Sequence, residues 1–226
     1  MLALAGILLI PNALFAQEDE KKIVAEAPKP EEIDKRIAGV LPNYRTTDGT
    51  KPFERISAKE KLTIAAKDSF DKPMYVITAV LAGIGQATNS HPELGQGMAG
   101  YGRRYVRTLA TNIIGNMMAE GVMPALLHDD PRYFRMGKSY GSVGKRIWYS
   151  ATRVIVNRRD SGKWSFNTSE WLGNAVAVGI QNSYYTVGRT WSSNLINLGL
   201  QVGVDASSNV LKEFWPDLKR KFVHRH

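Results

Sequence analysis

Between Glu170 and Asp205 the chain carries a single charged side chain, Arg189, and its small residues recur in steps of four. Four residues make about one helical turn, so each series gives a helix one smooth side that another backbone can approach closely. This spacing is typical of helices packed in or against a membrane, where close packing replaces a weak hydrophobic drive. The positions that we predict to serve helix packing are Ala79, Gly83, Gly173, Ala177, Gly179, Gly199 and Gly203.

Capping signals and helical spacing predict further helices along the chain. Ser57 with Glu60, and Asn167 with Glu170, have the spacing of a capping box at a helix start. Pro216 is expected to end the last helix, because proline cannot donate to the helical ladder. We therefore expect a mainly α fold, a compact bundle of about five to six Gly/Ala-rich helices with a helical hairpin over residues 168–215.

Two further segments are expected to be helices, and two others fit either a helix or a strand. A long helical pattern covers residues 97–127, with a kink expected at Pro124, and a shorter one covers residues 145–158. Residues 175–180 and 198–204 alternate large and small side chains, so strands remain an alternative there. The flanking caps and the steps of four favour helix.

The first part of the chain differs in composition from the rest. Residues 1–16 carry no charge and lie where the apolar region of a secretory signal belongs, which predicts a signal peptide or an N-terminal anchor. Residues 17–56 are rich in Lys, Glu and Pro and predict a flexible linker. A helical domain is expected over residues 57–218 and a basic tail over residues 219–226. Export to a bacterial periplasm or envelope membrane follows as a prediction.

Charge and cysteine content restrict the partners. The chain has no cysteine, which excludes a disulfide scaffold and a thiolate nucleophile. The net charge is +9, and residues 17–36 hold seven acids and five bases, a balance of −2 that leaves +11 on the remainder. A basic exported body indicates a membrane surface or a membrane-protein partner rather than nucleic acid. Self-association into a homo-oligomer is a further option, and no cofactor is predicted.

The densest group of side chains that could do chemistry is His128, Asp129 and Asp130, with Arg132 close behind. Two carboxylates beside an imidazole could hold a divalent metal or transfer protons. Consecutive residues do not share a helix face, however, and no pair of histidines has metal-ligand spacing. In the alternative interpretation, which we favour, Asp130 caps a short helix that begins at Pro131, and Arg132 pairs with an acid. No metal is predicted.

Arginine and tryptophan side chains form a second set of candidates. They combine cations with aromatic rings, as at a lipid headgroup layer or a polyanion site. Pairing of these arginines with acids of the same chain is the alternative. The residues predicted to contact a membrane or polyanion are Arg103, Arg104, Arg107, Arg153, Arg158, Arg159, Trp148, Trp171 and Trp191.

Three stretches lack Asp, Glu, Lys and Arg, namely residues 73–92, 171–188 and 190–204. Asn174, Gln181 and Asn182 lie inside the second stretch, and unpaired amides are costly in hydrocarbon, so a single lipid-exposed helix is not expected there. Two interpretations stay open, helices closely associated with a membrane and a soluble bundle with a core of small residues.

Four short strings follow one another along the chain, namely residues 100–103 (GYGR), 128–133 (HDDPRY), 160–162 (DSG) and 212–217 (KEFWPD). This order resembles that of an uncharacterised group of exported bacterial envelope proteins, and the resemblance covers about residues 57–217. The resemblance implies export and a single compact domain, with no assigned activity. We expect a non-catalytic, membrane-associated structural or interaction subunit. The alternative is a small envelope enzyme, such as a metal-assisted hydrolase, centred on His128, Asp129 and Asp130.

Overall fold

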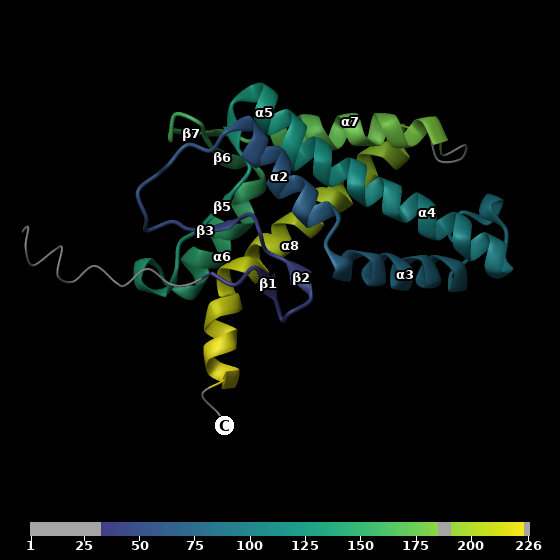
Figure 1. The fold of residues 1–226 in the computed structure, drawn as a ribbon, viewed down its shortest axis with the longest axis horizontal. Helices are drawn as coiled ribbons and strands as arrows, with labels where there is room; N and C mark the ends of the chain where they lie inside the picture. Colours follow the sequence, from purple (N-terminus) through teal and green to yellow (C-terminus); the bar gives the residue numbers. More distant parts are fainter. Residues whose placement is uncertain (1–32, 185–190, 224–226) are drawn as a thin grey trace, which may run out of the picture. The chain divides into compact units, whose positions relative to one another are not determined.

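The computed structural model describes residues 33–184 and 191–223, and the expected signal peptide at residues 1–16 lies outside them. The described residues are mainly helical, as predicted (Figure 1). The helices are α2 (Ala58–Ser69), α3 (Lys72–Ala87), α4 (Gly97–Asn116), the π-helix η2 (Met117–Val122), α5 (Met123–Leu127), α6 (Val143–Ala151), α7 (Thr168–Tyr184) and α8 (Trp191–Val223). Both segments with alternating large and small residues are helical, since they lie within α7 and α8.

The predicted caps begin their helices. The backbone N–H of Glu60 donates to Ser57 Oγ at 3.2 Å, and Ser57 N–H donates back to the Glu60 carboxylate at 2.7 Å. At the start of α7, Glu170 N–H donates to Asn167 Oδ1 at 3.2 Å. Each bond satisfies an amide at a helix end that has no partner within the helix.

The long pattern over residues 97–127 is one continuous run of α4, η2 and α5. In place of the kink expected at Pro124, the helix widens into the π-helix η2 directly before this residue. Proline has no N–H to donate to the carbonyl four residues earlier, which belongs to Glu120. An extra residue in the turn is a common response, and such turns are frequent at functional sites.

Short strands occupy segments that the sequence did not predict as strands. β1 (Arg36–Ile37) pairs with β2 (Leu41–Pro42), and β3 (Thr46–Asp48) runs parallel to β5 (Tyr133–Arg135). A third sheet has the order β4–β6–β7, from Asp129–Asp130, Val156–Arg159 and Trp164–Phe166. The part of the expected linker at residues 33–56 is therefore paired and belongs to the compact unit that begins at residue 32.

Three local predictions were wrong. Asp130 does not cap a helix but lies in β4, because His128 ends α5 in the left-handed conformation and Asp130 then pairs with Arg158 of β6. The helix expected over residues 145–158 gives way at Thr152 to a 3-10 turn and then to β6.

The third error concerns Pro216, which lies inside α8 rather than at its end. Arg135 Nε and Arg146 Nη2 donate to the backbone carbonyl of Glu213 at 2.8 and 2.9 Å, and Pro216 itself is buried. These external donors support the helix where proline breaks the ladder of hydrogen bonds.

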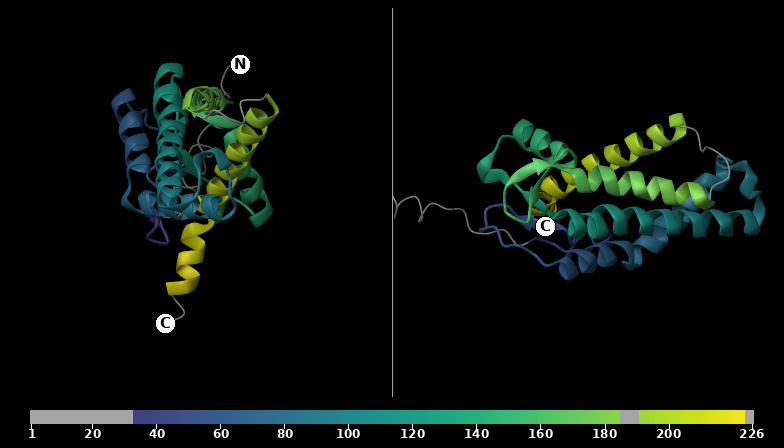
Figure 2. Two further views of the ribbon diagram at one scale, coloured as in Figure 1. Left: turned by 90° about the vertical axis from the view of Figure 1, so that its right-hand side faces the viewer. Right: turned by 90° about the horizontal axis from the view of Figure 1, so that it is seen from above.

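Figures 1 and 2 show how the helices pack against one another. α3 lies along α4, α2 crosses η2, and α7 lies against η2, α4 and α5. α8 runs beside α7 and then packs on α6 and β5. The π-helix is thus enclosed by α2 and α7.

The small residues predicted for packing divide into two groups. A Cβ built on Gly173 would lie 2.5 Å from Ala119 Cα, and Ala177 one turn later is buried. By the same construction Gly179, Gly199 and Gly203 meet no described atom within 4 Å. Close helix packing therefore occurs at the start of α7, against η2, and not at those three glycines.

The two remaining positions, Ala79 and Gly83, lie on α3 where it packs against α4. Tyr101 connects both contacts, since its hydroxyl donates to the Ala79 carbonyl at 3.1 Å and its ring lies 4.0 Å from a Cβ built on Gly83. Both positions therefore serve the α3–α4 contact.

The interior is held together by buried charges as well as by apolar contacts. Glu213 of α8 has no exposed surface, and its carboxylate accepts four hydrogen bonds of 2.7–3.0 Å. The donors are Tyr133 Oη, Arg146 Nε and the backbone N–H groups of Met136 and Gly137. One side chain thereby connects α8 to β5, to the loop after it and to α6.

Gly173→Ala and Gly179→Ala should change stability in opposite directions. The new methyl at residue 173 meets backbone atoms of η2 that cannot move aside, so we expect a loss of about 1–3 kcal/mol. The methyl at residue 179 meets nothing and improves helix propensity, so we expect a gain of up to about 1 kcal/mol. Urea denaturation measures both. Equal effects of the two substitutions would contradict the packing described here.

Glu213→Gln should lower the free energy of unfolding by about 3–5 kcal/mol, because Arg146 loses its buried partner and the new amide opposes existing donors. Glu54→Gln, at an exposed position, is the control and should have little effect. Urea denaturation of the two variants would disprove the role of Glu213 if their midpoints agreed.

Candidate functional site

The structure disperses the three residues of the candidate active site. Asp129 is buried and accepts from Ser169 Oγ at 2.7 Å, and Asp130 is buried and receives Arg132 at 2.6 and 2.9 Å. The predicted pairing of Arg132 with an acid is confirmed. The His128 side chain is exposed, with Nδ1 3.7 Å from an oxygen of Asp160. Within residues 33–184 and 191–223, no three His, Asp, Glu or Cys residues are arranged to hold a metal ion.

The first arginine cluster, on α4, is mostly structural. Arg104 is buried and donates to the carbonyls of Ser90, His91 and Gly95, so it closes the turn between α3 and α4. The prediction that Arg104 contacts a membrane or polyanion was therefore wrong. Arg103 is exposed, although one of its nitrogens donates to Leu94 O at 3.0 Å. Arg107 lies half-buried on α4.

The predicted tryptophans also differ in their environments. Trp148 on α6 and Trp191 at the start of α8 are exposed. Trp171 is half-buried, donates its indole N–H to Val154 O at 3.1 Å and stacks on Phe166. Trp148 and Trp191 are thus available to an external surface, and Trp171 is part of the packing.

The second arginine cluster surrounds Trp164 of β7. The guanidinium carbons of Arg153 and Arg158 lie 4.5 and 4.8 Å from the centre of the Trp164 ring. Arg158 also lies 4.5 Å from the Phe134 ring, and Arg153 lies 4.3 Å from the Tyr149 ring. Such cation–π contacts hold a guanidinium in place without neutralising its charge. Arg159, the next residue on β6, is exposed and lies 3.6 Å from Asp129.

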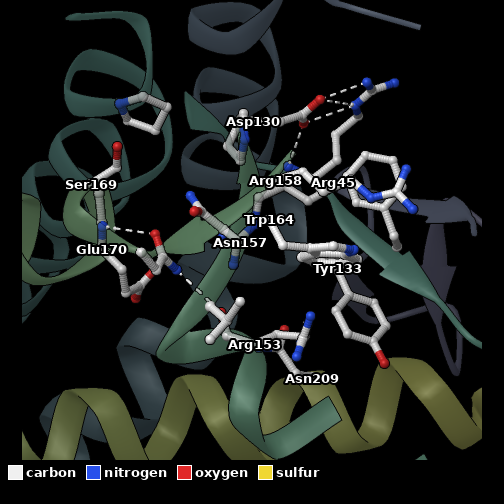
Figure 3. Close-up of a pocket in the computed structure, with 17 residues that line it drawn as sticks. Arg45, Asp130, Tyr133, Arg153, Asn157, Arg158, Trp164, Ser169, Glu170 and Asn209 are labelled. Atoms are coloured by element: carbon white, nitrogen blue, oxygen red, sulfur yellow. Dashed lines mark hydrogen bonds and ion pairs between the residues drawn. The ribbon is translucent and has the colours of Figure 1, made fainter. Parts of the chain in front are cut away.

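A pocket of about 40 Å³ lies beside these arginines (Figure 3). Its lining includes Arg45, Arg132, Arg153, Arg158 and the side chains of Asn157 and Asn209. Figure 3 shows Ser169 and Glu170 on one side and Trp164 and Tyr133 on the other. A single bound water needs roughly 10–15 Å³ of cavity volume, so the pocket has room for a ligand group of a few heavy atoms.

Not every cation in the pocket is free. Arg132 pairs with Asp130, and Arg45 pairs with Glu120 at 2.7 Å. Arg158 has no acidic partner among the described residues, and its buried Nε has no hydrogen-bond partner there. Within the described part of the chain, Arg153 donates to Tyr149 O and to the Thr152 hydroxyl and to no acid. The pocket therefore has an excess of positive charge.

Beneath the pocket, charged groups gather between η2, α7 and α8. Two cations, Arg45 and Lys212, lie among four acids. The acids are Asp68, Glu120, Glu170 and Asp205. Since acids outnumber cations by two and most of the cluster is buried, protonation of two carboxyls is the least costly way to neutralise it.

The directions of the pKa shifts agree with this balance. Burial raises the pKa of Glu120 to about 8, against the opposing effect of Arg45, and raises that of Glu170 to about 8 with help from Asp205. Burial also lowers the pKa of Lys212 to about 8, with Arg45 acting in the same direction. The Arg45–Glu120 ion pair favours ionised Glu120, but burial outweighs it, and one oxygen of Glu120 has no hydrogen-bond partner.

No family model, curated protein or solved structure matches this chain. The resemblance to exported envelope proteins stays a prediction, and the chemistry of the site rests on its own residues.

Apolar side chains gather on the exposed face of α3. Val76, Val80 and Ile84, one turn apart, expose 65%, 57% and 54% of their surface, and Tyr75 and Leu81 beside them are also exposed. The start of α8 repeats this pattern with Trp191 and Leu195. None of the helices within the described ranges has the length and apolar character needed to cross a membrane.

The buried charge cluster predicts an unusual dependence of stability on pH. From about pH 5 to about pH 8 the folded chain holds protons on Glu120 and Glu170 that the unfolded chain releases, so stability should fall by a few kcal/mol as pH rises. Above about pH 8 the unfolded chain keeps a proton that Lys212 lacks in the fold, so stability should recover. Urea denaturation over this range should therefore show a minimum of stability near pH 8.

Glu120→Gln should reduce the loss of stability between about pH 5 and about pH 8, because an amide at residue 120 does not titrate. The exposed control Glu54→Gln should leave this loss unchanged. An unchanged pH profile in Glu120→Gln would contradict the assignment of the proton to Glu120.

Proposed function

We propose that this chain is a non-catalytic protein of the bacterial envelope that associates with the surface of a lipid bilayer through α3 and the start of α8. The observation that carries the proposal is the exposed apolar face of α3, which runs through Val76, Val80 and Ile84. Apolar side chains in one stripe of a helix favour burial in the interface of a membrane.

The distribution of charge supports a lipid surface as the occupant of this face. No Asp, Glu, Lys or Arg occurs from residue 73 to residue 92, so all of α3 beyond its first residue is uncharged. Exposed bases border the uncharged stretch, with Lys72 at the start of α3 and Arg103 on α4. Two exposed aromatic rings, Tyr75 on α3 and Trp191 at the start of α8, are of the kind enriched at the water–lipid boundary. The positive net charge adds attraction to anionic headgroups.

The proposed association leaves the chain on the membrane rather than across it. The apolar residues form stripes on helices whose other sides pack against the protein. This arrangement suits a body that inserts side chains into the headgroup layer. The proposal includes export, which the uncharged residues 1–16 favour.

A catalytic role receives no comparable support. The carboxylates of Asp129 and Asp130 are both engaged by protein donors, and His128 lies on the surface apart from them. A general base needs a free lone pair within reach of a substrate proton.

Val80→Asp should weaken the binding of the full chain to vesicles of phosphatidylcholine by at least about tenfold, because a carboxylate in the interface is costly to desolvate. Thr63→Asp, on the exposed side of α2, adds the same charge elsewhere and should bind like the wild type. Flotation of vesicles with each protein measures the bound fraction. The proposal fails if wild-type protein does not float with vesicles or if both variants float equally well.

A further inference from the structure

The pocket beside Trp164 contains cations whose charge nothing in the fold explains. Arg158 is partly buried, is held between the rings of Phe134 and Trp164, and has no acid to pair with among the described residues. Its Nε is buried, and within residues 33–184 and 191–223 it has no hydrogen-bond partner. A buried donor without a partner costs roughly 1–3 kcal/mol, so such a group in a native fold needs a reason.

We propose that this pocket binds a compact oxyanion of the phosphate class, held by Arg158 and Arg153. Both residues line the pocket, and each guanidinium carbon lies within 5 Å of the centre of the Trp164 ring. Guanidinium groups provide several N–H donors in a plane, which suits recognition of phosphate oxygens.

The other side chains of the lining favour an anion as well. Asn157 and Asn209 add amide groups to the lining of the pocket, and neither amide nitrogen donates a hydrogen bond within the described residues. Of the two acids in the lining, Asp130 is neutralised by Arg132, and burial keeps Glu170 protonated at neutral pH. A cation would therefore be repelled where an anion is attracted.

Size and the number of donors narrow the ligand. A volume of about 40 Å³ accommodates a group of the size of phosphate. Donors come from β6, from the turn before it and from α8, so they approach from several directions. A tetrahedral group with oxygens on all sides can accept from more of them than a planar carboxylate can. Free phosphate and the phosphate of a lipid headgroup share this chemistry.

The rigid setting of the two arginines supports a binding role. Their cation–π contacts and the strand pairing of β6 hold them in position before a ligand arrives. A site that is already ordered loses little entropy on binding. Arg159 shows the contrast, since it follows Arg158 on β6 but lies exposed beside Asp129.

Isothermal titration calorimetry of the full chain with inorganic phosphate tests the proposal. Wild-type protein should bind one phosphate saturably, and Arg158→Gln should weaken binding by at least about tenfold, as expected for loss of a charge-assisted hydrogen bond. Arg159→Gln removes the same charge from the neighbouring position and should bind like the wild type. No saturable binding, equal losses in both variants, or acetate binding as tight as phosphate binding would each overturn the proposal.

Asn157→Asp keeps the inference testable if Arg158→Gln does not fold. The new carboxylate has the size of the amide and keeps an oxygen acceptor for Ser165, but it places a negative charge in the lining that repels an oxyanion. We expect loss of phosphate binding with an unchanged or raised melting temperature. Asn89→Asp, at an exposed turn, is the matched control. Phosphate binding that survives in Asn157→Asp would overturn the proposal.

Vesicles separate the two sources of the oxyanion. Flotation is compared between phosphatidylcholine alone and phosphatidylcholine containing phosphatidic acid, whose headgroup is a phosphate monoester. Extra binding that depends on phosphatidic acid and is lost in Arg158→Gln identifies a headgroup, and phosphate binding without this extra flotation identifies free phosphate. Calorimetry uses no lipid, so failure of the α3 surface to bind membranes and failure of the pocket to bind phosphate are distinguished.

Discussion

The fold depends on how the carboxylate of Glu213 is satisfied in the interior. A carboxylate taken out of water is tolerated only where strong donors replace its hydration, and here a guanidinium, a phenol and two backbone amides do so. These donors come from β5, from the loop after it and from α6, so the geometry of one buried group ties together segments nearly eighty residues apart. The backbone carbonyl of Glu213 also accepts hydrogen bonds from Arg135 and Arg146, and these bonds support α8 next to Pro216.

Local signals in the sequence predicted the helices well and the strands poorly. Ser57 and Asn167 begin helices because capping depends on a few neighbouring atoms. The strands are only two to four residues long, too short for alternation to appear, and the pairings β3–β5 and β4–β6 join segments that are distant in sequence. Asp130 followed by Pro131 looks like a helix start, and only the pairing of Asp130 with Arg158 reveals a strand. Tertiary contacts therefore decide these segments.

The candidate site was predictable in part, because Arg153 and Arg158 stand out as bases near aromatic residues. Arg45 was missed because it lies in a segment whose composition resembles a linker, and its role follows only from contact with Glu120. The buried state of Glu120 and Lys212 was missed too, since charged residues are ordinarily exposed. One signal was present: Lys212, Glu213 and Asp217 belong to the string at residues 212–217 that contributes to the resemblance, and all three have partners in the ionic interior.

The π-helix η2 acts as a phase shift between two parts of one long helix. A residue added to a helical run turns everything beyond it by about 100° relative to an uninterrupted α-helix. Glu120 points to Arg45 while α4 keeps its contact with α3, and both orientations depend on that added residue. Deleting a single residue from η2 would rotate α4 against α5 and the strand that follows it, so the orientation of the α3–α4 pair relative to the arginine pocket depends on this one turn.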